Sequence, residues 1–501
     1  MATKILLWLD VISAHFGMAK WLQEKYDCEI SAIIDVNNGK KFYDEQQIVK
    51  FHSKWYLREC FDNSQKKPDL EYLAEIEKKY KFDIWKLVFS DVNLYKFNPY
   101  YKFNYDEILT IIEQECRFFE KIIDIEQPNF LAIRITDLSN GQILQKICEA
   151  KNIKILMLSF TRFENRYYIS HEYDYLEFTK KSVGKKEYSF EEMREGSKIT
   201  TVAQTKFRKK YRSTTKSWIY GSLKYLSIIL NSKYSKYYAN FGKSFFKVIF
   251  IEGVFPLRKI KRKQFIDSNI SKQINAHENF IYYPLQLEPE RTLLIPAGHY
   301  TNQIEVITNI ARSIPIDFQL IVKEHPMQKI YAWRDISFYK KIQELPNVKL
   351  IHPSVSQKTI LEKCKMVITV TGTTGLEGIL HKKPCIVLAD TIYDRLSSVH
   401  RLKNLEELPN TIKESLKKEV SLKDVNEFMD LLNTNTFDLD ITNSEIIIKF
   451  IEEFFYDGYL FDTEINNEKA TEFIKNNSKY FEILAEEHIK KIKELKLENQ
   501  Q

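Results

Sequence analysis

Hydroxyl, glycine and carboxylate residues gather in residues 371–377, a stretch with the sequence TGTTGLE. A β-branched apolar run precedes it at 367–370, and apolar residues at helical spacing follow it at 376–380, a pattern that predicts a strand, a loop and a helix. Free N–H groups at a helix N-terminus bind phosphate. The loop is therefore a candidate phosphate site, with an ordinary threonine-capped turn as the alternative. The candidate ligands are Thr371, Thr373, Thr374 and Gly375, with Glu377 as an acceptor for ribose or sugar hydroxyls.

A second group of reactive side chains follows another predicted strand. The apolar run 318–322 leads directly into Lys323, Glu324, His325 and Pro326. A neutral imidazole can hydrogen-bond a phosphate or a base, and a protonated one can offset phosphate charge. For the His-Pro pair alone, a structural turn histidine is the alternative. Because both groups end strands of one predicted parallel sheet, they are expected at the same edge, and together they predict a nucleotide-phosphate site.

The elements that must position such sites alternate between strands and helices. Residues 4–36 predict a strand, a helix and a second strand, and a similar pattern returns at 128–158, which favours a doubly wound α/β fold. The GxGxxG fingerprint is missing, so a Rossmann dinucleotide site is not expected. Polar residues beyond these strands, Asp137, Arg162 and Arg166, are candidates to line a cleft, with surface ion pairing as the alternative.

Length and composition limit the class of protein. A chain of 501 residues with 44% hydrophobic residues predicts at least two folded domains. Six cysteines without a CxxC pair argue against a zinc ribbon or a disulfide framework and for a reducing cytosol. The first apolar run does not resemble a signal peptide, and no apolar stretch approaches the roughly 18 residues that span a bilayer. We therefore expect a cytoplasmic protein, soluble or peripheral to the membrane.

Positive charge is concentrated in residues 206–263, where sixteen Lys and Arg residues accompany one acid, Glu252. Aromatic residues are interleaved with them. Basic residues are attracted to anionic lipid, and aromatic rings favour the headgroup zone. This segment is a candidate membrane-surface patch. A nucleic-acid surface or a solvated helical insertion would share the composition.

Three motifs together resemble a known family. They are YYPLQLEPE at 282–290, VKEHP at 322–326 and TGTTGLEGILHKKPCIVL at 371–388. In this order and spacing they resemble the capsule polysaccharide biosynthesis proteins, a group similar to GT-B glycosyltransferases that includes the capsular Kdo transferases. The resemblance is strong over 276–392, weaker over 125–170 and absent from the basic insertion and the tail.

The resemblance implies a GT-B-like α/β fold, with two Rossmann-like doubly wound domains facing a cleft, a helical insertion and C-terminal helices. His325 and Pro326 are similar to the HP motif that contacts cytidine monophosphate in bacterial sialyl- and Kdo-transferases. Thr373 and Thr374 match the hydroxyl positions that hold its phosphate. Such enzymes stabilise the leaving phosphate without a metal, so catalysis would rest on positioning and on leaving-group stabilisation. No cofactor beyond the nucleotide-sugar donor is expected.

For inversion, a carboxylate or histidine of the N-terminal domain should take the acceptor proton. Asp137 with Gly141 is what this sequence retains of the acidic pair near a glycine in related sialyltransferases. Glu288 and Glu290 could instead line the cleft from the donor side. The candidates for the base are Asp10, His15 and Asp137.

The sequence thus predicts a metal-independent glycosyltransferase that moves a sugar, from a CMP-linked donor, to a surface or capsular polysaccharide or glycolipid. Its partners would be the nucleotide sugar, the acceptor and an anionic membrane surface, with no nucleic acid. The alternatives are a UDP-N-acetylglucosamine 2-epimerase, a teichoic-acid-type polyol-phosphate transferase and a noncatalytic scaffold of a capsule assembly complex. The expected regions are an acceptor-side domain (1–195), a basic aromatic insertion (196–275), a nucleotide-sugar domain (276–440) and a helical tail (441–501).

Overall fold

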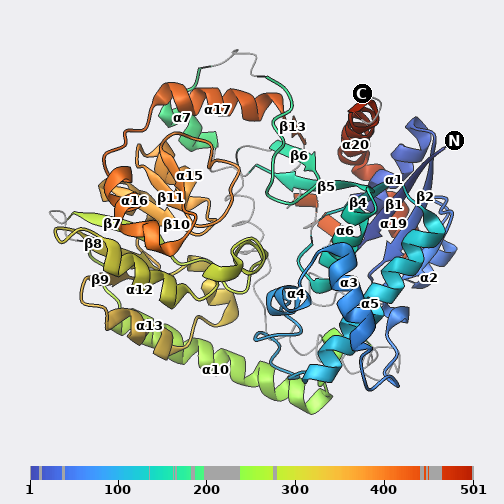
Figure 1. The fold of residues 1–501 in the computed structure, drawn as a ribbon, viewed down its shortest axis with the longest axis horizontal. Helices are drawn as coiled ribbons and strands as arrows, with labels where there is room; N and C mark the ends of the chain where they lie inside the picture. Colours follow the sequence, from blue (N-terminus) through green and yellow to red (C-terminus); the bar gives the residue numbers. More distant parts are fainter. Residues whose placement is uncertain are drawn as a thin grey trace. The chain divides into compact units, whose positions relative to one another are not determined.

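The fold is described from a computed structural model of the chain. It describes residues 2–10, 14–36, 40–134, 136–161, 163, 166–181, 187–196, 237–274, 279–439, 445–446, 449–450 and 465–498. The chain divides into two compact units (Figure 1). The first unit comprises Met1–Glu177, Lys198–Val248 and Thr436–Gln501, and the second comprises Phe178–Ser197 and Ile249–Asn435.

The first unit is built on a seven-stranded sheet of order β13-β6-β5-β4-β1-β2-β3. Strands β1 to β5 run parallel, whereas β6 is antiparallel to β5 and β13 is antiparallel to β6. The parallel strands are almost wholly apolar because helices cover both faces. The strands are β1 Thr3–Leu9, β2 Cys28–Ile34, β3 Lys54–Tyr56, β4 Phe130–Ile133, β5 Lys154–Phe160, β6 Arg166–Ser170 and β13 Phe437–Asp438.

Two apolar cores flank this sheet. The longest helix of one face, α5, begins with a capping box in which Asn104 and Glu107 each accept from the other's backbone N–H. The helices are α1 Ala14–Lys25, α2 Lys40–Glu45, α3 Leu70–Tyr80, α4 Ile84–Ser90, α5 Tyr105–Glu126, α6 Ser139–Ala150, α19 Asn467–Asn476 and α20 Ser478–Glu498, with 3-10 turns η1 Leu57–Cys60 and η3 Tyr238–Asn240.

The C-terminal helices belong to the core of the first unit. Phe481 of α20 is fully buried, and its ring stacks on Trp21 of α1 with 6.1 Å between centroids. Gly17 permits this approach, because a Cβ there would lie 2.3 Å from the Phe481 ring. The sequence left open whether the tail packs back or extends, and the structure answers that it packs against α1.

The second unit contains a six-stranded, fully parallel sheet of order β12-β11-β10-β7-β8-β9. The strands are β7 Phe280–Pro284, β8 Gln319–Lys323, β9 Val348–Ile351, β10 Met366–Thr369, β11 Cys385–Val387 and β12 Val399–Arg401. The helices are α7 Phe190–Gly196, α10 Phe245–Asn269, α11 Arg291–Leu294, α12 Gln303–Ser313, α13 Ile336–Gln343, α14 Gln357–Lys363, α15 Thr374–Leu380, α16 Leu408–Ser415 and α17 Leu422–Thr434, with 3-10 turns η4 Gly298–Tyr300, η5 Pro326–Tyr331 and η6 Leu405–Glu407.

One mostly parallel sheet and one fully parallel sheet, both with covering helices, confirm the predicted α/β class. The boundaries differ from those predicted, since 178–197 packs with the second unit and 436–501 with the first. Asn426 of α17 attaches the segment around Tyr188 to the second unit. It does so through hydrogen bonds with the backbone N–H and C=O of Tyr188, at 2.7 and 2.9 Å. Much of the basic insertion, 197–236, lies outside the described residues. Within the described ranges, no helix combines the length and apolar composition needed to cross a bilayer.

Candidate functional site

The loops after β7 and β10 meet at the carboxyl edge of the second sheet. Gln286, two residues beyond β7, donates from Nε2 to the hydroxyl of Thr369, the last residue of β10, at 3.0 Å. The same hydroxyl oxygen accepts from the backbone N–H of Gly372 at 3.1 Å. The Thr/Gly loop is thus fixed to its neighbouring strand at the edge where parallel sheets bind ligands.

His325 begins the turn η5 directly after β8. Its Nδ1 accepts from the backbone N–H of Met327 at 3.2 Å, and its own backbone N–H donates to Oε1 of Glu324 at 2.7 Å. An Nδ1 that accepts leaves the proton of a neutral ring on Nε2. Pro326 is exposed at the first position of the turn, where its fixed φ suits the helical start. The half-buried His325 is therefore held with Nε2 as a hydrogen-bond donor.

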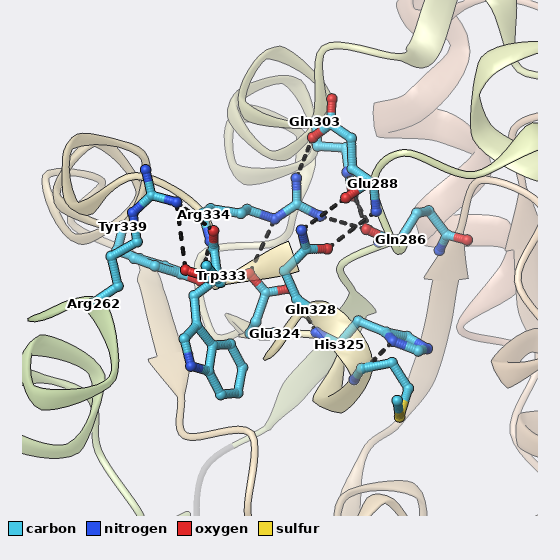
Figure 2. Close-up of polar contacts among 12 residues, drawn as sticks. Arg262, Gln286, Glu288, Gln303, Glu324, His325, Gln328, Trp333, Arg334 and Tyr339 are labelled. Atoms are coloured by element: carbon cyan, nitrogen blue, oxygen red, sulfur yellow. Dashed lines mark hydrogen bonds and ion pairs between the residues drawn. The ribbon is translucent and has the colours of Figure 1, made fainter. Parts of the chain in front are cut away.

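Arg334 joins the loops that follow β7 and β8. Figure 2 shows its guanidinium at the centre of contacts with Glu324, Glu288 and the backbone of Gln286. The Arg334 Nε lies 3.0 Å from Oε2 of Glu324, and the hydroxyl of Tyr339 donates to the same oxygen at 2.8 Å. Glu288, which was predicted to line the cleft from the donor side, forms an ion pair with Arg334. The network fixes the backbone that carries His325.

Lys323, the last residue of β8, is only 4% exposed. Burial lowers the pKa of its ammonium to about 8, and the carboxylate of Glu377 opposes that shift. Burial likewise raises the pKa of Glu377 to about 7, against a hydrogen bond from Gln357 at 2.7 Å and the charge of Lys323. Among the residues described, the Lys323 ammonium has no hydrogen bond or ion pair. An anion at this edge would supply one.

The remaining predicted donor-side residues differ in their surroundings. The hydroxyl of Thr371 donates to the backbone of Thr292 at 2.9 Å, whereas Thr374 is buried and accepts from Gln357 at 3.1 Å. Thr373 occupies the N-cap of α15, without a side-chain capping bond. Gln357 therefore links Thr374 to Glu377, whose charge acts on Lys323. Glu290, by contrast, is exposed at the N-cap of α11.

Gly375 meets a packing requirement. A Cβ at this position would lie 2.3 Å from the hydroxyl of Tyr393, which donates to the backbone of Gly372 at 2.5 Å. A side chain at Gly375 would displace Tyr393, whose hydrogen bond to Gly372 fixes the Thr/Gly loop. The glycine thus shapes the candidate phosphate loop.

A second cluster of charges lies at the carboxyl edge of the first sheet. Asp10, directly after β1, pairs with Nε of Arg134 at 3.3 Å. Burial raises the pKa of Asp35, directly after β2, to about 6, with Arg58 lowering it and the charges of Asp10 and Asp137 raising it further. The Arg58 Nε lies 3.9 Å from Oδ1 of Asp35. The structure thus adds Asp35 to the predicted pair of carboxylates.

Asp35 escaped the sequence prediction because the predicted strand ran from Ile30 to Val36 and included it. The structure ends β2 at Ile34, so Asp35 is the first residue beyond the strand. Arg134 and Arg58 were missed for a related reason, since a single basic residue after a short strand carries no spacing signal. A strand boundary placed two residues earlier would have identified Asp35.

His15 does not join these charges. It lies in the first turn of α1, 2% exposed, with its ring edge-to-face with His488 of α20 at 6.1 Å. Burial, with the charge of Arg134, lowers its pKa to about 4. A ring so shielded is poorly placed to meet an acceptor, so its role as the base stays a prediction that burial disfavours.

The two predicted cleft arginines have different outcomes. Arg166 lies on β6 and donates to the Thr436 hydroxyl at 3.1 Å, and its guanidinium lies 3.6 Å from the Asp438 carboxylate of β13. It therefore helps to attach the last strand of the sheet. Arg162 lies outside the described residues.

The described site lies within a region that matches a known family. Residues 186–429 match the family described as capsule polysaccharide biosynthesis protein. This part of the chain is similar to that family. The match includes all three motifs that carried the predicted resemblance, and it covers most of the second unit together with residues 198–248 of the first.

Individual relatives of this capsule-family region are distant. The chain is 29% identical over 136 residues to the capsule polysaccharide modification protein LipB of Neisseria meningitidis serogroup A. That match covers 26% of this chain and 32% of LipB, so the chain spans about a third of this curated relative.

Solved structures that resemble the chain include two enzymes. One is KpsC of Thermosulfurimonas dismutans, a beta Kdo 2,7 transferase, with 10% identity over 67% of this chain and 89% of that chain, and a TM-score of 0.34. The other is the UDP-GlcNAc 2-epimerase of Methanocaldococcus jannaschii, with 12% identity over 89% of this chain and 98% of that chain, and a TM-score of 0.24. At these scores neither likeness bears on the function of this chain.

Proposed function

We propose that this chain is a glycosyltransferase of capsule or surface polysaccharide synthesis that uses a nucleotide-activated sugar, with a CMP-linked sugar as the donor. The observation that carries the proposal is Lys323, a residue that is 4% exposed and whose ammonium has no hydrogen-bonding partner among the described residues. It ends β8 at the same sheet edge as His325 and the Thr/Gly loop. The match of residues 186–429 to the capsule family supports it.

In this proposal the donor phosphate takes the place of the missing counter-charge. Lys323 offsets its negative charge, His325 donates from Nε2, and the hydroxyl of Thr373 supplies a further donor. These groups would strengthen their interactions as charge grows on the leaving nucleotide, which is how a preformed site lowers a barrier. Glu377 would be held protonated beside the bound phosphate, because two negative charges there would repel.

The resemblance assigns the acceptor to the first unit, where the sequence proposed Asp10 and Asp137 as bases. Asp35 joins them as a candidate, because a carboxyl with a pKa of about 6 is close to the value that suits a general base near neutral pH. Transfer would move the sugar carbon from the phosphate oxygen to the acceptor oxygen, and the acceptor proton to a carboxylate.

A thermal-shift titration tests the donor site. CMP, CDP, UMP, UDP and GDP would be added to the wild type and to the variants Lys323→Met and His325→Ala. A ligand at about 100 times its dissociation constant stabilises a protein by about 2.7 kcal/mol, a shift of a few degrees. We expect CMP to stabilise the wild type selectively and to lose this effect in both variants. His299→Ala is the matched control, since His299 is exposed on η4.

The other outcomes point to the alternatives. Stabilisation by UDP alone would indicate a UDP-sugar transferase or an epimerase, and stabilisation by CDP alone would indicate polyol-phosphate transfer. Binding of CMP with no release of CMP from CMP-sugars, in the presence of polysaccharide or glycolipid acceptors, would favour a scaffold. No shift with any nucleotide would contradict the phosphate site itself.

A further inference from the structure

Helix α10 carries large apolar side chains that face solvent. Phe246, Phe250, Leu257 and Ile260 are 81, 68, 65 and 63% exposed. Their spacings of four, seven and three residues place them on one face of a helix that turns about 100° per residue. Gly253 falls on the same face and borders open space, because a Cβ added there would meet no atom within 4 Å. The exposed face is therefore a continuous stripe of about four turns.

Basic residues border this stripe on both sides. At about 100° per residue, Arg258 and Lys261 fall on one border, and Lys263 falls on the other, where it pairs with Asp267. Lys259 lies about 140° from the centre of the stripe. Among the described residues, Arg258, Lys259 and Lys261 form no ion pair or side-chain hydrogen bond. They remain available to an anionic partner. An apolar face with Lys and Arg along its borders is typical of helices that lie in the plane of a membrane interface.

The opposite side of α10 is anchored to the second unit. Arg262 donates to the backbone of Trp333 at 2.9 Å and pairs with Asp335, the N-cap of α13. The ring of Phe265 stacks on that of Tyr339, with 6.4 Å between centroids. Figure 1 shows α10 as one long helix that runs past α13. The anchoring contacts leave the stripe on the outer face.

We propose that α10 is a membrane-surface helix that inserts Phe246, Phe250, Leu257 and Ile260 into the headgroup region of an anionic lipid layer. The charge distribution selects this occupant. In an antiparallel pairing of two copies through the stripe, the border with Arg258 and Lys261 would face the same border of the other copy, which is unfavourable. An anionic leaflet instead offers an apolar acyl region for the stripe and negatively charged headgroups for the basic residues beside it. The inference is independent of the donor site.

Vesicle co-sedimentation of the full chain tests the proposal. Vesicles would contain phosphatidylcholine alone or phosphatidylcholine mixed with phosphatidylglycerol. We expect binding to the mixed vesicles that weakens as salt is added. The triple variant Phe250→Ser, Leu257→Ser, Ile260→Ser should bind more than tenfold more weakly. Ile316→Ser is the matched control, because Ile316 is a fully exposed apolar residue of the same unit outside α10.

Three results would overturn the proposal. The triple variant could bind like the wild type, which would locate lipid binding in another part of the chain, such as residues 197–236. The wild type could fail to bind the mixed vesicles. Light scattering could find a dimer that the triple variant abolishes, which would make the stripe a subunit interface. A circular dichroism spectrum and a melting temperature like those of the wild type would establish that the triple variant folds, and neither measurement depends on the donor site.

Discussion

Glu324 and Arg334 form an ion pair in which the carboxylate is fully buried and the guanidinium side chain is 5% exposed, with 3.0 Å between Nε and Oε2. Removing one member of such a pair leaves a buried charge without compensation. We expect Arg334→Met to lower the free energy of unfolding by about 3–5 kcal/mol. Urea denaturation measures this loss.

The matched control for this prediction is Arg312→Met. Arg312 is an exposed arginine at the end of α12, and its replacement should change the free energy of unfolding by less than about 0.5 kcal/mol. Equal stability of Arg334→Met and Arg312→Met would show that the network around Arg334 contributes little to the fold.

Glu377→Gln tests the pH dependence that the buried carboxyl imposes. The folded pKa of Glu377, about 7, lies above its ordinary value of 4.5, so the folded chain binds an extra proton between these values. The contribution of the protonated Glu377 to the free energy of unfolding is therefore full below about pH 4.5, and it is lost as the pH rises through 7. Glutamine cannot ionise, so we expect the variant to be more stable than the wild type at pH 8, by on the order of 2 kcal/mol. Denaturant titrations at pH 5 and 8 measure the difference, which should shrink at pH 5.

His488→Phe tests the buried imidazole pair of His488 and His15. Here the wild type is expected to lose stability as the pH falls, whereas Glu377 causes a loss as the pH rises. Burial lowers the folded pKa of His488 to about 3, below the ordinary value of 6.5, and its Nε2 has no hydrogen-bond partner within the described residues. The contribution of the neutral His488 to the free energy of unfolding is present above pH 6.5, and it is lost as the pH falls. Between pH 7 and 5 the wild type should therefore lose about 2 kcal/mol more stability than His488→Phe. An identical loss in both proteins would contradict a neutral His488 in the fold.

Gly17→Ala tests the contact between α1 and the C-terminal helix α20. The new methyl would overlap the ring of Phe481, which is fully buried and has no space to retreat. We expect a loss of about 1–3 kcal/mol in the free energy of unfolding. In a Phe481→Leu background the same change should cost clearly less, and a double-mutant cycle measures the coupling. Additive effects would mean that the two residues do not touch.

The strands of the second unit were predictable because they are buried on both faces and are sharply bounded. The sequence analysis placed two of them at 318–322 and 367–370, and the structure has each within one residue. Runs of β-branched residues that end at proline, glycine or charged residues carry this signal locally. The short strands β3, β6, β12 and β13 were not predicted, because each mixes apolar residues with charged or basic ones and so forms no continuous apolar run.

The polar network of the candidate site could not be predicted in the same way. Arg334 meets Glu324 ten residues away and Glu288 forty-six residues away. The chain reaches Arg334 through Ala332 and Trp333, both of which have positive φ. Neither alanine nor tryptophan favours positive φ, so this conformation could not be predicted from the residue types. His325 and the threonines were identified from their places after strands, whereas the groups that hold them depend on tertiary contacts.

The first unit is assembled from both ends of the chain, since α1 of the N-terminal segment packs against α20, and β6 pairs with β13. A ribosome completes Ile249–Asn435 of the second unit before it makes Thr436–Gln501. The second unit can therefore finish its core during synthesis, whereas the first keeps the apolar face of α1 uncovered until the last segment emerges. During that interval the first unit exposes apolar surface, which is the kind of surface that promotes aggregation.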